Sequence, residues 1–305
     1  MTSLGSSSNT EGNTRRFKVA GHSFTLKVEA GNGIWSKLLN YSPFETSEAG
    51  KDIFSLGVSF DGSVSLPEGL RPVFKKETAA EEPLLNLYQK GEEWWAEMAP
   101  FGNMPPVAFL SMSEDFTEAS LVVKEGKFGK FAIDNAMMLL FAFNTSDKST
   151  IEMHASVIMK DGKGFLFLGS SGTGKSTQSR MWLESVPGSE LLNDDNPAVR
   201  VSENGEIRVF GTPWSGKTPC YRNLDVQVGA IVKIRRCREN RITPLSLPEA
   251  YAEISSSTSS LKSVRRMADG LHSTLAAIAT TVPCYVLDCL PDHDSAQVCS
   301  KEVCR

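Results

Sequence analysis

Residues 169–176 combine glycines, hydroxyls and a lysine at a spacing typical of a phosphate-binding loop. They match the pattern G-x-x-x-x-G-K-[ST] at every fixed position, as Gly169, Ser170, Ser171, Gly172, Thr173, Gly174, Lys175 and Ser176. Glycines let the backbone curl so that N–H groups point at phosphate oxygens. Lys175 can reach the β- and γ-phosphates, and the Ser176 hydroxyl can bind Mg²⁺. We therefore predict that residues 169–177, Thr177 included, contact the phosphates of ATP.

A strand and a helix must position this loop. The apolar run Phe165–Leu168, bounded by glycines, predicts a buried strand before it. A helix predicted to begin near Lys175 would direct its N-terminal dipole at the bound anion. Because the motif requires a strand before and a helix after, we interpret the match as functional rather than as a surface loop rich in glycine and serine.

Two adjacent acids form the second chemical element. Asp194 and Asp195 follow a short apolar stretch, far enough after Lys175 for a helix, a turn and a strand that returns beside the loop strand. Adjacent residues at a strand end point to opposite sides. One acid can therefore bind Mg²⁺ while the other accepts a proton from an attacking hydroxyl. A solvated acidic turn is the alternative, which the position after a phosphate loop disfavours.

His154 lies shortly before the loop strand, in Ile151–Met159, a stretch that predicts one neighbouring strand. It can contact the metal or the transferring phosphoryl group. A lone histidine on an apolar strand is more often a core residue, and the residues alone leave both interpretations open.

The ordered combination of three segments resembles the HPr kinase and phosphoenolpyruvate carboxykinase superfamily of phosphate-loop proteins. The segments are Met153-His154-Ala155-Ser156, Gly169 to Thr177, and Leu191-Leu192-Asn193-Asp194-Asp195-Asn196. The resemblance covers about residues 150–200 well and the remainder to 305 loosely. It implies an α/β phosphate-loop kinase domain with a mixed sheet of that type.

The resemblance also implies roles for single residues. Lys175 and Ser176 would bind phosphate and Mg²⁺, and His154 would approach the metal or the phosphate. Asp194 would be the general base and Asp195 a metal ligand, although the two acids can exchange these roles. HPr kinases place a basic loop near the substrate where this chain has residues 213–222. Lys217 and Arg222 are therefore weaker candidates for contacts with the substrate. The candidates for catalytic roles are Asp194, Lys175 and His154.

Composition limits the classes of partner. The chain has 305 residues, 40% of them hydrophobic, and a net charge of -4, so no global basic field attracts nucleic acid. No window approaches the ~18 apolar residues of a membrane span, and no apolar signal core begins the chain. The six cysteines show no C-x-x-C pattern, which favours free thiols in a reducing compartment. We expect a cytoplasmic protein without membrane or nucleic-acid partners.

Patterning along the chain predicts three parts: a disordered leader over 1–15, a β-rich domain over 16–145 and the phosphate-loop kinase-like domain over 146–305. The leader is rich in Ser, Thr, Asn and Gly. In the second part, alternation predicts hairpins over Arg16–Val28 and Ile53–Leu66, whereas Glu81–Met98 fits a helical face roughly. The third part is predicted to end with a helix over Leu261–Ala279 and a strand over Cys284–Leu290.

These observations predict an ATP- and Mg²⁺-dependent phosphotransferase, an HPr kinase-like enzyme that acts on a hydroxyl. The acceptor is a protein serine or a small molecule such as free serine. Two alternatives remain: a small phosphoenolpyruvate carboxykinase-like enzyme, and a nucleotide-dependent binding or regulatory module without turnover. The sequence leaves open whether the chain forms a homo-oligomer.

Overall fold

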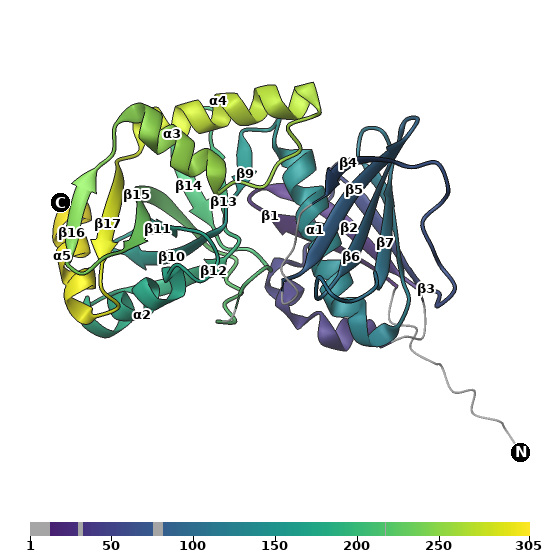
Figure 1. Ribbon diagram of the computed structural model, residues 1–305, viewed down its shortest axis with the longest axis horizontal. Coiled ribbons are helices and arrows are strands. Elements are labelled where there is room, and N and C mark those ends of the chain that lie inside the picture. The colour runs from purple at the N-terminus through teal and green to yellow at the C-terminus, as the bar shows by residue number, and fades with distance from the viewer. Residues whose placement is uncertain (1–12, 30–32, 76–81, 217) are drawn as a thin grey trace, which may run out of the picture. The chain divides into compact units, whose positions relative to one another are not determined.

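The computed structural model describes residues 13–29, 33–75, 82–216 and 218–305. The chain is an α/β protein with a strand-rich N-terminal region and a mixed sheet in its C-terminal half (Figure 1). Most of the predicted leader lies outside the described residues, but β1 begins at Thr14, so its last two residues belong to a strand.

The chain forms two compact units that interleave along the sequence. The described parts of the first fall within residues up to 17, 23–39 and 45–137, and the second takes 18–22, 40–44 and 138–305. The division falls within helix α1 (Gly129–Thr145). Two short N-terminal segments therefore belong to the same unit as residues 169–176.

An eight-stranded sheet forms the N-terminal region, in the order β1-β2-β3-β8-β7-β6-β5-β4. Its strands are β1 (Thr14–Val19), β2 (His22–Val28), β3 (Ser55–Phe60), β4 (Arg71–Lys75), β5 (Leu84–Lys90), β6 (Glu93–Ala99), β7 (Ala108–Met112) and β8 (Glu118–Val123). Three 3₁₀ helices accompany them: η1 (Ile34–Lys37), η2 (Leu39–Phe44) and η3 (Gly126–Phe128).

Two predictions for this region were wrong. Glu81–Met98 contains no helix among its described residues. Instead, β5 and β6 form a hairpin in which Trp94, Ala96 and Met98 are buried alternately, the period of a strand. Ile53–Leu66 contributes the single strand β3, which pairs in parallel with β2 and β8 rather than with its own continuation.

The second sheet is mixed, as the sequence predicts, and runs β12-β10-β11-β15-β14-β13-β9, with β17 pairing with β15 and β16. Its strands are β9 (Thr150–Glu152), β10 (Ala155–Lys160), β11 (Lys163–Leu168), β12 (Glu190–Asp195), β13 (Ala198–Val201), β14 (Ile207–Phe210), β15 (Asp225–Arg236), β16 (Arg241–Pro244) and β17 (Cys284–Cys289). The loop strand β11 is parallel to β15 and antiparallel to β10.

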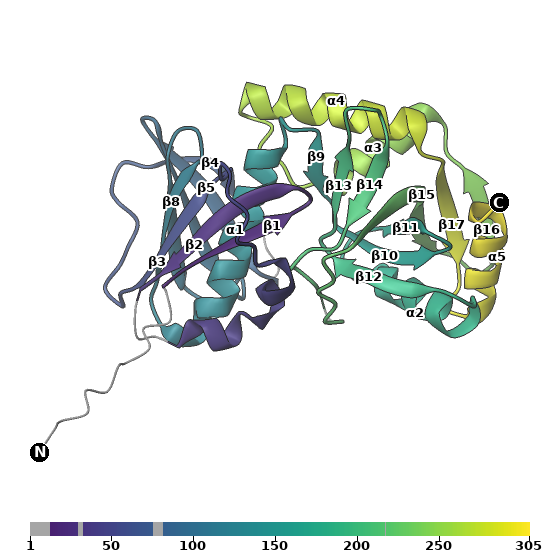
Figure 2. The ribbon, with the colours of Figure 1, turned by 180° about the vertical axis from the view of Figure 1, so that it is seen from behind.

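Helix pairs cover both faces of this sheet (Figures 1 and 2). Helices α3 (Leu247–Ser256) and α4 (Arg265–Thr281) lie on one face, and α2 (Lys175–Ser185) and α5 (His293–Val303) lie on the other. Trp182 of α2 packs on Phe165 and Phe167 of β11, with ring centroids 5.2 and 5.6 Å apart. This aromatic contact fixes the helix that follows the loop onto the strand that precedes it.

Two further differences from the sequence prediction bear on the site. Ile151–Met159 is not one strand, because the chain breaks at residues 153–154 into β9 and β10, which pair with different partners. The strand β12, which ends in the two acids, lies beside β10 and not beside the loop strand β11. Helix α5 and strand β16 also escaped prediction.

Among the described residues, none of the helices combines the length and apolarity needed to cross a membrane.

Candidate functional site

The glycine-rich loop, residues 169–176, joins β11 to α2, and the helix begins at Lys175 as predicted. Gly172 and Gly174 have φ values of 75° and 122°, a region that side chains with a Cβ rarely enter. An added Cβ would meet nothing within 4 Å at either position, so the backbone conformation itself requires glycine. The first-turn N–H groups of α2 have no intrahelical acceptors, which makes this helix end suitable for an anion.

Lys175 is buried against the loop. Its Nζ donates to the carbonyl oxygen of Gly169 at 2.9 Å and lies 2.9 Å from Nε2 of His154. Burial lowers the pKa of Lys175, while the carboxylates of Asp195 and Asp194 act in the opposite direction. The ammonium is therefore held inside the loop, close to both acids.

His154 lies between the loop and the acids because of the break before β10. Ala155, the next residue, is opposite Leu168 on one side and Asp195 on the other. The Nε2 atom of His154 lies 3.2 Å from Oδ1 of Asp195. A neutral imidazole nitrogen either accepts or donates, so Nε2 accepts from Lys175 or donates to Asp195 but not both at once. The position of one proton links all three side chains.

The acid turn, residues 193–196, depends on Asn193, a residue that the sequence reasoning did not select. Its buried amide donates to Oγ1 of Thr212 at 3.1 Å and to the carbonyl of Trp214 at 3.0 Å. Its Oδ1 accepts from the backbone N–H groups of Asp195 and Asn196 at 3.1 and 3.0 Å. The available signal in the sequence was a polar residue directly after the apolar pair Leu191-Leu192, because a buried polar side chain is usually hydrogen-bonded.

The two acids have different surroundings. Asp194 is only 3% exposed, and its Oδ2 is buried without a hydrogen-bond partner in the described part of the chain. Asp195 is more open, and its carboxylate contacts His154 and accepts from the Asn196 amide at 3.0 Å. A buried carboxylate oxygen without a partner is costly unless a ligand completes its contacts.

Arg236, at the end of β15, also contacts the loop and was not predicted. Its guanidinium donates to the carbonyl oxygens of Gly172 and Thr173. In a trans peptide the carbonyl and the following N–H point in opposite directions. Arg236 thereby fixes the orientation of the peptide planes that present the loop N–H groups.

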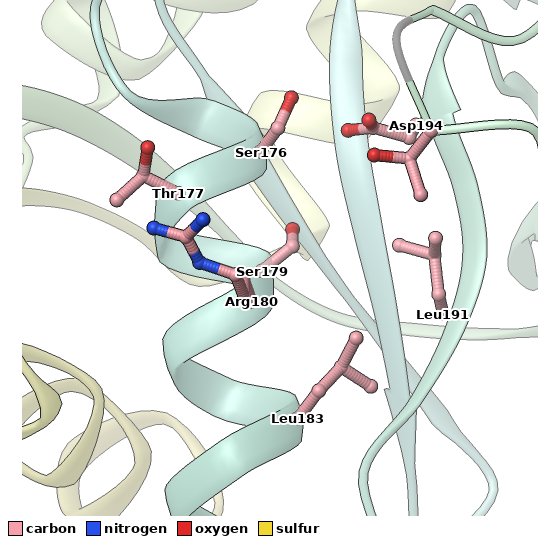
Figure 3. Close-up of a pocket in the computed structure, with 8 residues that line it drawn as sticks. Ser176, Thr177, Ser179, Arg180, Leu183, Leu191 and Asp194 are labelled. Atoms are coloured by element: carbon pink, nitrogen blue, oxygen red, sulfur yellow. The ribbon is translucent and has the colours of Figure 1, made fainter.

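Two cavities meet at this site. The loop cavity, of about 340 Å³, is lined by His154, Ser171, Gly172, Gly174, Lys175, Ser176, Thr177, Asp194, Asp195, Gly216 and Arg236. The α2 cavity, of about 230 Å³, is lined by Ser176, Thr177, Ser179, Arg180, Leu183, Leu191, Asp194 and Thr218 (Figure 3). Asp194 lines both cavities, whereas Asp195 lines only the loop cavity.

Comparison with protein families places this geometry in context. The family model described as SynChlorMet cassette protein ScmC matches residues 124–291, more than half of the chain. The chain belongs to the ScmC family. A search of curated proteins finds no match. Among solved structures, the chain is similar to the HPr(Ser) kinase/phosphatase from Coxiella burnetii, with 13% sequence identity and a TM-score of 0.29. The alignment covers 49% of this chain and 91% of the chain in that structure. At that TM-score the similarity does not establish a shared fold.

The segment matched to the ScmC family contains every residue that lines the two cavities. The structure brings His154, Lys175, Ser176 and both acids together in the cavity beside the glycine-rich loop. Within the loop, Ser170 and Thr173 bond through their hydroxyls at 2.8 Å.

Of the two substrate candidates only Arg222 is described, and it lines neither cavity. Lys217 lies outside the described residues. Arg222 donates to the carbonyl of Leu191 at 2.9 Å and to the carboxylate of Glu190 at 2.8 Å, so its charge supports strand β12. All six cysteines are unpaired. Within the described ranges, no three His, Cys, Asp or Glu side chains gather where they could hold a metal.

Proposed function

We propose that this site binds ATP with Mg²⁺ and transfers the γ-phosphoryl group to a hydroxyl, as an HPr kinase-like phosphotransferase. One observation carries the proposal: Lys175, His154 and Asp195 form a continuous chain of contacts at 2.9 and 3.2 Å beside a glycine-rich loop. The buried, unpartnered Oδ2 of Asp194 lies next to that chain. A solvated acidic turn would need neither contact.

The differing surroundings of the acids support separate roles. Asp194 lines both cavities, so it is suited to accept the proton of a hydroxyl in the α2 cavity. The hydroxyl oxygen then bonds to the γ-phosphorus, the bond from that phosphorus to the β,γ-bridging oxygen breaks, and ADP leaves with the electron pair. Lys175 and the loop N–H groups hold the phosphates during this displacement.

The donor set fits Mg²⁺. The Ser176 hydroxyl and the carboxylate of Asp195, both lining the loop cavity, are hard oxygen donors of the kind this cation prefers. Mg²⁺ commonly takes one or two protein carboxylates and completes its shell with phosphate oxygens and water, so no all-protein cage is required. When bound, the cation would neutralise charge on the β- and γ-phosphates. His154 then orients Asp195 through Nε2.

The proposal is tested by incubating the protein with γ-labelled ATP, Mg²⁺ and candidate acceptors, among them hydroxy acids and seryl peptides. Label transferred to an acceptor, absent in Asp194→Asn, supports a phosphotransferase. Tight binding of Mg²⁺-ATP with no transfer and no hydrolysis would instead indicate a nucleotide-dependent binding module. Absence of binding by the wild-type protein would overturn both.

A further inference from the structure

The α2 cavity has one apolar wall, one cation and one buried acid. Leu183 and Leu191 contribute the apolar surface, and among the described residues that line the cavity Arg180 is the only basic one. Figure 3 shows Ser176, Ser179 and Leu183 on the side of α2 that faces Asp194 and Leu191. At its inner end the cavity shares Ser176, Thr177 and Asp194 with the loop cavity.

Helix geometry brings the cation to the reacting end. Ser176 and Arg180 are four residues apart and so lie on one stripe of α2, about 6 Å apart along its axis. Side chains in a helix lean toward its N-terminus. The Arg180 guanidinium accordingly extends along α2 toward Thr177 (Figure 3). Arg180 and Asp194 line the same cavity, so a ligand of sufficient length can contact both side chains.

Arg180 remains able to bind an anion. It is exposed, and its contact with Glu184 of the same helix is 3.9 Å, beyond hydrogen-bond distance. The other carboxylate oxygen of Glu184 lies 2.8 Å from Nε2 of His293, which gives that acid a closer partner. A guanidinium offers paired donors that match a carboxylate or a phosphate. Because the phosphates of ATP would lie in the loop cavity, a carboxylate is the anion that we assign to this position.

We propose that the α2 cavity binds the phosphoryl acceptor, and that this acceptor is a small hydroxy-carboxylic acid with apolar carbons. The inference rests on the proposed function, whose substrate class it names. The carboxylate pairs with Arg180, the carbon chain lies against Leu183 and Leu191, and the hydroxyl faces Asp194. The volume of about 230 Å³ is below the ~300 Å³ at which drug-sized pockets begin, which suits a small molecule. An internal serine of a protein lacks the carboxylate.

The test measures ADP release and direct binding for four probes: 3-hydroxybutyrate, its methyl ester, L-serine and an end-blocked Ala-Ser-Ala peptide. Wild-type protein should phosphorylate the two acids, with a KM for the ester at least about tenfold above that for 3-hydroxybutyrate. Arg180→Gln should raise the KM for the acids by about tenfold or more, and leave the KM for the ester and the affinity for Mg²⁺-ATP unchanged. Ligand-observed NMR should show the same loss of acid binding without turnover.

Arg265→Gln is the matched control, because Arg265 is also an exposed helical arginine with an acid four residues on, at 3.6 Å. It should behave as wild type. Equal KM values for the acids in wild type and Arg180→Gln, or transfer to the peptide alone, would overturn this inference while leaving the kinase function standing. Failure of the wild-type protein to bind Mg²⁺-ATP would instead overturn the proposed function.

Discussion

The glycine-rich loop is one continuous segment whose backbone conformation depends on its own glycines, with Arg236 as a contact from outside it. The acid turn, in contrast, is held by backbone and side-chain groups from several parts of the chain. Gly172 and Gly174 supply the positive φ values of the loop locally. The acid turn needs Asn193, the carbonyl of Trp214 and the N–H of Gly216, which donates to the Asp194 carbonyl at 2.6 Å.

The support of the acid turn extends into the N-terminal part of the chain. The indole N–H of Trp214 donates to the hydroxyl of Tyr41 at 3.0 Å, and Asn40 donates to the carbonyl of Pro213 at 2.9 Å. Both residues belong to the short segment 40–44 that joins the second compact unit. Under the proposed function, nucleotide binding would depend mainly on the loop itself and on Arg236, while phosphoryl transfer would also depend on the distant residues that hold the acid turn.

The largest effect is expected at Asp194. Asp194→Asn is nearly isosteric but removes the proton acceptor, so phosphoryl transfer should fall by roughly 10²- to 10⁴-fold while Mg²⁺-ATP affinity stays close to wild type. Steady-state kinetics and calorimetry check the two quantities separately. Asp195→Asn is the companion variant, and it should instead raise the Mg²⁺ concentration required, because an amide is a poorer ligand for a hard cation. The opposite pattern would exchange the roles of the two acids.

Asn193→Ala should separate the turn from the loop. The change removes the acceptor of two backbone N–H groups and the amide that donates to Thr212 and to the Trp214 carbonyl, so the free energy of unfolding should fall by about 2–4 kcal/mol. Transfer should fall more than ATP affinity under conditions where the variant is folded. Urea denaturation measures the loss. Asn204→Ala is the control: Oδ1 of Asn204 also accepts two hydrogen bonds, from Ser202 and from the backbone N–H of Glu206, but in an exposed turn. Its loss should lower the free energy of unfolding much less. Equal costs for the two variants would contradict the bracing role of Asn193.

Tyr41→Phe tests the remote end of this support. The variant removes the acceptor of a buried indole N–H, which should destabilise the protein by about 1–2 kcal/mol. A double-mutant cycle with Trp214→Phe should show that the two changes are not additive. Tyr251→Phe is the control, because it removes a tyrosine hydrogen bond at the surface, 2.8 Å from His272. Strictly additive costs would show that the segment 40–44 does not support the acid turn.

The smallest effect concerns Glu152, which is fully buried with Oε2 lacking a partner among the described residues. Burial, and to a lesser degree Asp195, raises the pKa of Glu152 well above its ordinary value of 4.5. The folded state therefore retains a proton that the unfolded state releases, and stability should fall as pH rises above 4.5. Glu152→Gln mimics the protonated acid.

Urea denaturation of wild type and Glu152→Gln at pH 5 and pH 8 measures this effect. The variant should be the more stable of the two at pH 8 and should lose less stability between the two values. An unchanged pH dependence in the variant would show that Glu152 is not the titrating group.

The sequence predicted the parts of the site that are local. A strand, a glycine-rich loop and a helix starting at Lys175 follow one another as expected, because glycine conformation and apolar periodicity are properties of neighbouring residues. The prediction of a helix over Leu261–Ala279 was also close to the structure, in which α4 spans Arg265–Thr281. The mixed α/β character of the C-terminal half followed from alternating strands and helices.

What the sequence did not predict depends on pairing between distant residues. Strand β10 lies between β11 and β12, and only this arrangement brings His154 beside both Lys175 and Asp195. The contacts of Arg236 with the loop and of Tyr41 with Trp214 join residues far apart in the chain, and no local pattern reports them. The prediction of a helical face over Glu81–Met98 was wrong because short apolar runs fit the helix and strand periods alike.

The central claim, that residues 169–176 hold the phosphates of Mg²⁺-ATP, is tested most directly by calorimetric titration of wild type and Lys175→Ala. The variant removes the buried cation that we propose faces two phosphates, so affinity should fall by about ten- to a hundredfold. Lys262→Ala, at an exposed lysine of the same unit, is the control and should bind as wild type. No binding by the wild-type protein, or equal affinity in Lys175→Ala, would contradict the account.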